Sequence, residues 1–186
     1  MRLFAFAGSL RKDSLNHKLV SAACEGATQK GETVELARFR DFTLPCYDGD
    51  LETSAGIPEG AVQLKEKILQ AQALIIATPT YNYSVPGTLK NAVDWVSRIR
   101  PMPFTGKPVL LVGASPSPLG SILGIYALRT SLEGLGCFVY PTVFSLASAE
   151  KAFDGDGKFS DRANAERLAK VVADFLVFAR ACTQIR

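Results

Sequence analysis

Short runs of uninterrupted apolar residues constrain the fold of this chain more than any other feature. Residues 73–77 and 109–112 are apolar without a break. A strand with one face in water alternates apolar and polar residues, whereas an unbroken run predicts a strand buried on both faces of a parallel sheet. Residues 3–7 form a third run of this kind, and residues 33–39 and 137–140 are weaker strand candidates.

Apolar residues at helical spacing separate these five strands. The stripes start at Leu15, Ala61, Val85, Leu123 and Leu168, and Ser14 is the expected N-cap of the first helix. Five alternating strands and helices predict an α/β fold, a doubly wound five-stranded parallel sheet with helices on both faces, in one domain over residues 1–186. Ligands of such sheets bind beyond the carboxyl ends of the strands. The loops after the first, third and fourth strands are therefore the candidate site.

The composition excludes several other classes of protein. With 47% hydrophobic and 21% charged residues the chain is not expected to be disordered, and no apolar run approaches the length of a membrane span. A net charge of +3 without basic blocks argues against nucleic-acid binding and is compatible with a small anionic ligand. Four dispersed cysteines and one histidine predict neither a metal site nor a disulfide scaffold, so we expect reduced thiols in the cytoplasm.

The first loop, residues 8–16, leaves a buried strand and opens a helix. A helix N-terminus offers free N–H groups to an anion, Ser9, Ser14 and Asn16 add side-chain donors, and Arg11 adds a cation that can bind phosphate through two nitrogens. The glycine pattern of a dinucleotide-binding loop is missing. The loop therefore favours a terminal phosphate monoester, and the alternative is an ordinary capped helix with a solvated arginine.

The second loop, residues 78–87, follows the third strand. It carries Tyr81, Asn82 and Tyr83 between two prolines, and Pro86 is expected to start the next helix. Such a loop can offer backbone hydrogen bonds and flat apolar surface to a planar heteroaromatic ring. Alternatively, the two tyrosines pack against neighbouring helices.

Together the two loops resemble the NAD(P)H-dependent FMN reductase family, which includes quinone, chromate and azo-dye reductases on a flavodoxin-like fold. The motifs that carry the resemblance are Gly8-Ser9-x-Arg11-x-x-Ser14-x-Asn16 and Pro79-x-Tyr81-Asn82-x-Ser84-x-Pro86-Gly87-x-Leu89-Lys90-Asn91-Ala92-x-Asp94-Trp95. The resemblance implies that Ser9, Arg11, Ser14 and Asn16 hold the FMN phosphate. It implies that Pro79, Thr80, Tyr81, Asn82, Tyr83 and Ser84 line the isoalloxazine, and that Ser115 in the third loop, residues 113–120, faces the flavin.

The function implied is that of an FMN-containing reductase with ping-pong hydride transfer. NAD(P)H delivers hydride to flavin N5 and leaves, and a quinone, chromate, an azo compound or free flavin then accepts the electrons. No side chain is expected to act as a catalytic acid or base, because the flavin carries the redox chemistry. The resemblance also implies a homodimer or homotetramer.

Two positions depart from the pattern of that family. Thr80 stands where a glutamate is common, which changes the charge expected beside the flavin. Gly120-Ser121 stands where a glycine pair is common, which bears on the width of the nicotinamide or acceptor slot.

Other functions remain open from the sequence. A flavodoxin-type electron carrier would be expected to be acidic, and this chain is weakly basic. A response-regulator receiver needs acids after the first strand, where Ala7-Gly8-Ser9 stands. A flavin-binding sensor without turnover is a further alternative.

Overall fold

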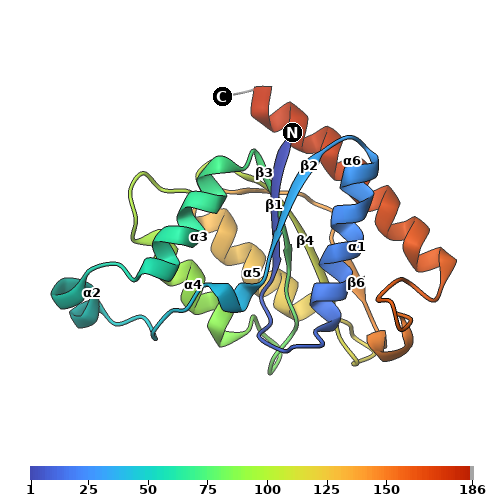
Figure 1. Ribbon diagram of the computed structural model, residues 1–186, viewed down its shortest axis with the longest axis horizontal. Coiled ribbons are helices and arrows are strands. Elements are labelled where there is room, and N and C mark those ends of the chain that lie inside the picture. The colour runs from blue at the N-terminus through green and yellow to red at the C-terminus, as the bar shows by residue number, and fades with distance from the viewer. Residues whose placement is uncertain (185–186) are drawn as a thin grey trace.

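A computed structural model describes residues 1–184 and contains a parallel sheet with helices on both faces (Figure 1). The strands are β1 (Arg2–Ala7), β2 (Thr33–Ala37), β3 (Ala73–Ala77), β4 (Pro108–Ala114), β5 (Phe138–Val139) and β6 (Phe144–Leu146). Their order is β2-β1-β3-β4-β5, and β6 also pairs with β4. This is the flavodoxin-like order, with the switch in strand order between β1 and β3.

The sheet has six strands, so the prediction of five was wrong at its edge. β5 and β6 both pair in parallel with β4, Val139 beside Val109 and Phe144 beside Val112. Between these two pairings the edge segment covers five residues, from 139 to 144, while β4 covers only three, from 109 to 112. Pro141 lies in that interval and has no N–H to donate to the ladder, so the edge strand breaks there.

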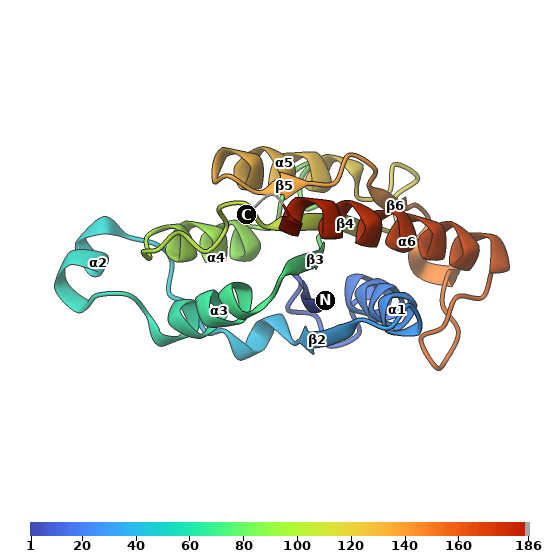
Figure 2. The same cartoon turned by 90° about the horizontal axis from the view of Figure 1, so that it is seen from above.

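Five long helices cover the sheet, as the apolar stripes predict. On one face lie α1 (Leu15–Gln29) and α6 (Arg162–Gln184). On the other lie α3 (Glu59–Gln70), α4 (Gly87–Ser97) and α5 (Ile122–Gly134), and the view in Figure 2 separates the two layers. Two short 3-10 turns, Phe39–Asp41 and Ala149–Lys151, complete the secondary structure together with the short helix α2 (Gly49–Ala55), which the stripes did not predict.

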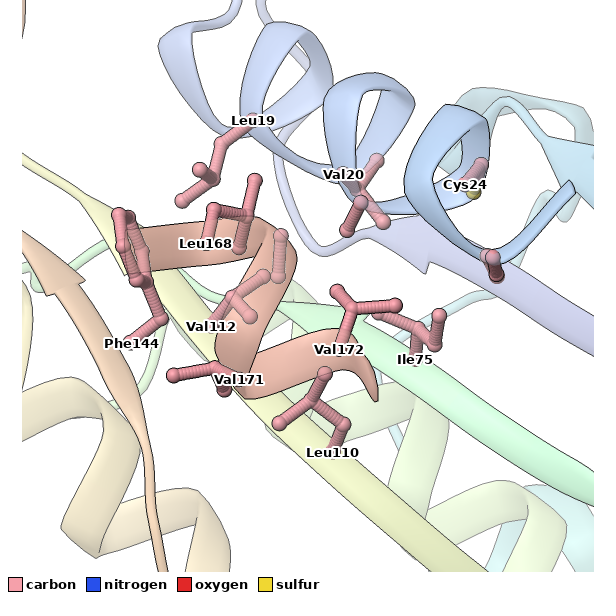
Figure 3. Close-up of a cluster of buried hydrophobic side chains, with 14 of the residues drawn as sticks. Leu19, Val20, Cys24, Ile75, Leu110, Val112, Phe144, Leu168, Val171 and Val172 are labelled. Carbon is pink, nitrogen blue, oxygen red and sulfur yellow. The ribbon is translucent and has the colours of Figure 1, made fainter. Parts of the chain in front are cut away.

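Alternate side chains of β1 face two separate apolar cores, one on each side of the sheet. Leu3, Ala5 and Ala7 face α1 and α6, while Phe4 and Phe6 face α3 and α4. The first core is drawn in Figure 3, where Leu19, Val20 and Cys24 of α1 and Leu168, Val171 and Val172 of α6 point toward Ile75, Leu110 and Val112 of the sheet. Small residues on that side of β1 leave room for α1 to pack close to the sheet.

Segment 43–57, which contains α2, is fastened to α4 by two side chains of the second motif. Trp95 Nε1 and Asn91 Nδ2 both donate to Pro45 O at 2.8 Å, and Asn91 Oδ1 accepts from Tyr47 N at 2.7 Å. Trp95 is fully buried and packs edge-on against Tyr47. Helix packing therefore accounts for this motif tryptophan.

None of the helices within residues 1–184 combines the length and the hydrophobicity that crossing a membrane requires.

Candidate functional site

The first, second and third loops meet at the carboxyl edge of the sheet and line two adjoining hollows. We call the smaller one, of about 60 Å³, the small hollow, and the other, of about 250 Å³, the large hollow. The small hollow is lined by Ser9, Arg11, Ser14, Leu15, Asn16, Pro79, Thr80, Tyr81, Ala114, Ser115 and Pro116. The large hollow is lined by Thr80, Asn82, Tyr83, Ser115, Ser117, Leu119, Gly120 and Leu123. Thr80 and Ser115 line both, so ten of the eleven expected site residues lie around two adjoining hollows.

Ser84 is the expected residue that lines neither hollow. Its contribution is to the backbone, since Tyr81 and Ser84 exchange two N–H···O bonds of 3.0 Å. Ser84 therefore closes the turn that presents Tyr81, Asn82 and Tyr83.

The first loop has the form expected of an anion cradle. Ser14 caps α1, and its Oγ accepts from His17 N at 3.2 Å, which leaves the hydroxyl proton free to be donated. Ser9 Oγ accepts from Arg11 N at 3.4 Å. The Arg11 side chain is exposed and makes no hydrogen bond or ion pair within the described part of the chain. Two hydroxyls and one unpaired guanidinium thus surround the small hollow.

Gly8 lets the first loop pass close to α4. A Cβ at this position would lie 2.4 Å from Leu89 Cδ2, a distance that requires a shift. Leu89 belongs to the second motif, so the two motifs pack against each other as well as lining one site.

His17 is half-buried beside the loop. Burial, and then the charge of Arg38, lowers the pKa of His17 below its usual value. The imidazole is therefore neutral at pH 7, and it lines neither hollow.

Asn16 is directed at the end of β4. Its Nδ2 donates to Ala114 O at 2.8 Å and its Oδ1 accepts from Ala114 N at 2.9 Å. The side chain is 4% exposed, although it borders the small hollow. The first loop is thus tied to the third by an amide that uses both of its polar atoms.

The second loop contains a tight two-residue turn that sequence patterns did not reveal. Asn82 and Tyr83 have φ values of 48° and 64°, the signs required at the centre of a type I′ turn. Asparagine tolerates this conformation, whereas tyrosine is strained in it. The turn leaves Tyr83 78% exposed and Tyr81 47% exposed. Packing of both rings against helices, the alternative interpretation, does not occur at Tyr83.

Thr80 joins the second loop to α5. Its Oγ1 accepts from Gly124 N at 3.0 Å and so caps one of the free N–H groups in the first turn of the helix. A Cβ on Gly124 would lie 2.5 Å from Pro79 O, which explains a glycine there. The group that the second loop places here is therefore a neutral helix cap, not a carboxylate.

The third loop is held on its outer side by the broken edge strand. Ser115 N donates to Leu146 O and Ser115 O accepts from Ala149 N, both at 3.0 Å. Ser115 Oγ accepts from Ser117 N at 3.1 Å, so its proton remains available to a ligand in either hollow. Leu119 and Leu123 supply the apolar wall of the large hollow. Sequence reasoning missed these two leucines, and the absence of charge from residue 114 to residue 128 was the available signal.

Ser121 does not narrow the large hollow. It is fully buried, a Cβ on Gly113 would lie 2.5 Å from its Cβ, and its N–H donates to Ser145 Oγ. Within residues 1–184 its own Oγ has no hydrogen-bond partner. The hollow is bordered at this point by Gly120, whose φ is +64°.

The donor set of these loops fits FMN. A phosphate monoester needs hydroxyl, N–H and guanidinium donors, and the small hollow has all three. The ring of a flavin needs flat apolar contacts with polar groups at its edge. Tyr83, the hydroxyls and the two leucines of the large hollow provide them, together with Tyr81 of the small hollow.

Comparisons with known proteins agree with this geometry. Residues 1–151 match the family described as NADPH-dependent FMN reductase. An NAD(P)H-dependent FMN reductase of Pseudomonas aeruginosa is 37% identical over 87% of this chain and 85% of its own, and a quinone reductase of Escherichia coli is 39% identical over 75% and 73%. The solved structure of FerB, a flavoenzyme NAD(P)H:acceptor oxidoreductase from Paracoccus denitrificans, superposes with a TM-score of 0.82 at 33% identity and 97% coverage of both chains. The chain therefore belongs to the NADPH-dependent FMN reductase family.

Proposed function

We propose that this protein is an NAD(P)H-dependent, FMN-containing reductase that passes electrons to quinones or other small oxidants. One observation carries the proposal: three loops with phosphate-binding and ring-binding chemistry line two adjoining hollows that share Thr80 and Ser115. The family and the relatives named above support the same activity.

The proposed roles divide between the two hollows. Ser9, Arg11 and Ser14 hold the FMN phosphate in the small hollow, at the N-terminus of α1. Pro79 to Tyr83 and Ser115 line the isoalloxazine: Pro79 and Tyr81 border the small hollow, Asn82 and Tyr83 border the large one, and Thr80 and Ser115 border both. When bound, FMN supplies the redox chemistry by accepting hydride from NAD(P)H and releasing electrons to the acceptor. The chain's own residues bind and orient the reactants.

The large hollow favours neutral, planar acceptors. None of its eight lining residues carries a formal charge, and the wall made by Leu119, Leu123 and Tyr83 is apolar. A quinone meets no unpaired charge there, whereas a chromate dianion would lose hydration without a cation to offset the loss. We therefore place quinones ahead of chromate and charged azo compounds as acceptors.

Preference for NADH or NADPH does not follow from Arg98 and Arg100, two cations that could in principle contact the 2′-phosphate of NADPH. Arg98 Nε donates to Glu52 Oε2 at 3.0 Å, and Arg100 Nη1 donates to Ser97 O at 2.8 Å. Both lie at the C-terminal end of α4, whereas the second loop precedes its N-terminal end. We propose NAD(P)H without a choice between the two.

An anaerobic spectrum tests the proposed function directly. Protein purified with FMN should show flavin absorbance that bleaches when NADPH or NADH is added and returns when a quinone is added. A flavodoxin-type carrier would keep its oxidised spectrum with either nucleotide. A sensor would bleach without turnover when quinone is in excess, and a preparation that binds no FMN would refute the proposal.

Assembly and location complete the proposal. We propose one FMN-binding domain over residues 1–186 that forms a homodimer or homotetramer. We also propose a cytoplasmic location, because Cys24, Cys46, Cys137 and Cys182 form no disulfide with one another among residues 1–184.

A further inference from the structure

Asn16 occupies a place in the sheet that no strand fills. β3 pairs with β4 as far as Ala77 beside Val112, and the ladder ends where Thr78 N donates to Val112 O at 2.9 Å. Beyond Thr78 the chain turns away into the second loop. Ala114, two residues after Val112, presents its N–H and C=O to the same side, where β3 no longer runs.

The Asn16 amide takes the position of the missing strand residue. An asparagine side chain has the same donor and acceptor groups as a peptide unit. Here the acceptor receives the Ala114 N–H and the donor reaches the Ala114 carbonyl, at 2.9 Å and 2.8 Å. The two bonds extend the pairing of β4 by one residue on its inner side.

This extension sets where the third loop begins. The next residue, Ser115, is held on its outer side by Leu146 and Ala149. With Asn16 inside and the edge strand outside, the chain leaves β4 in one fixed direction. Ser115 is thereby placed at the border of both hollows.

We propose that Asn16 is a positioning residue, which promotes flavin binding by holding Ala114 and the third loop in place rather than by contacting the phosphate. The inference rests on the proposed function, because it assigns the residue a role toward bound FMN. It differs from the phosphate-binding role expected for Asn16 from its motif.

Comparison of FMN with riboflavin distinguishes the two roles, because only FMN carries the phosphate. Titrations of the wild type, Asn16→Ala and Arg11→Ala with both flavins give an FMN-to-riboflavin affinity ratio for each protein. Asn16→Ala should weaken both flavins by a similar factor, roughly tenfold for two lost hydrogen bonds, and keep the wild-type ratio. Arg11→Ala should weaken FMN alone and lower the ratio. A ratio that falls in Asn16→Ala as it does in Arg11→Ala, or affinities that do not change, would overturn the inference.

Amide hydrogen exchange gives a second measurement that needs no flavin. In the wild-type apoprotein the Ala114 N–H should be protected, and Asn16→Ala should lose that protection while Leu110 and Leu111 in the same strand keep theirs. Equal protection of Ala114 in both proteins would contradict the role. Asn16→Leu, which keeps the side-chain size but leaves no room for water, serves as a second variant if the alanine variant does not fold.

The two proposals fail in different ways. If the wild type binds neither flavin, the proposed function is wrong, and exchange at Ala114 still tests the hydrogen bonds. If the wild type binds FMN, and Asn16→Ala weakens FMN but not riboflavin, the proposed function stands and the positioning role is wrong.

Discussion

Arg11 is the one cation that lines either hollow, and it has no partner among residues 1–184. Arg11→Ala should weaken FMN binding by about 1.5–3 kcal/mol, because it removes a charge-assisted contact to the phosphate. Fluorescence titration with FMN measures the loss. Lys12→Ala removes the same charge one residue away, outside the small hollow, and should change the affinity less. Equal losses in the two variants would indicate a general effect of net charge.

Tyr83 has a strained backbone conformation, because its φ is positive. Replacing it by glycine, which adopts positive φ freely, should raise the free energy of unfolding by about 1–2 kcal/mol, since the side chain is 78% exposed and buries little. Urea denaturation tests this gain. The same variant should change kcat/KM for quinones more than FMN affinity, because a ring that is 78% exposed lies at the rim of the large hollow, where an acceptor would enter. A less stable variant would show that the ring packs in solution.

Ionisation of the Cys24 thiol should make the free energy of unfolding depend on pH in the alkaline range. Burial, and then the nearby Glu25 carboxylate, raises the pKa of the Cys24 thiol to about 12. The unfolded thiol ionises near its ordinary value of about 8.5, so the folded state keeps the proton longer and stability falls as pH rises from there toward 12. The slope from this group is at most about 1.4 kcal/mol per pH unit.

Cys24→Ala should therefore remove part of the alkaline loss of stability. Denaturation of both proteins between about pH 8 and pH 10.5 measures it, and the stability difference between them should change over that range. A difference that stays constant with pH would assign the loss to other groups.

At the scale of elements, the start of α5 controls where the second loop lies. Gly124→Ala should lower the free energy of unfolding by about 1–3 kcal/mol, because the new methyl group would meet Pro79 O at 2.5 Å and displace the Thr80 cap. FMN affinity should fall with it.

Gly134 in the same helix provides the control for this change. A Cβ there meets nothing within 4 Å, so Gly134→Ala should be neutral or stabilising through helix propensity. The two variants are compared by urea denaturation. A stable Gly124→Ala protein with wild-type FMN affinity would show that the loop can shift without consequence.

At the scale of the whole molecule, we expect self-association. The outward side of α5 exposes Leu123 and Tyr126, and Leu119 in the third loop is 63% exposed beside them. A helix that is apolar on the side facing away from the sheet typically packs there against another protein surface. Sedimentation at micromolar concentration should therefore give a dimer or tetramer, and a monomer would contradict the prediction.

Local signals in the sequence were enough for the elements and the candidate loops. Apolar patterning placed β1 to β4, the five long helices and the Ser14 cap, and it was clearest for β1, β3 and β4, because burial on both faces of a sheet leaves a distinct pattern. The edge was predicted less well. Residues 137–140 were expected as a strand and contain β5, whereas β6, which follows Pro141 and has three residues, carries too little periodicity to be recognised.

The sequence by itself determined the α/β alternation, the chemistry of the three loops and, through its motifs, the family. Only the tertiary structure decided that Asn16 bonds to Ala114, ninety-eight residues away, that Thr80 caps α5, and that Asn82 and Tyr83 take positive φ. Periodicity reports which face of an element is buried, and it contains no information about which distant backbone group a polar side chain will meet. Those partners exist only once the strands have paired and the carboxyl ends of β1, β3 and β4 lie side by side.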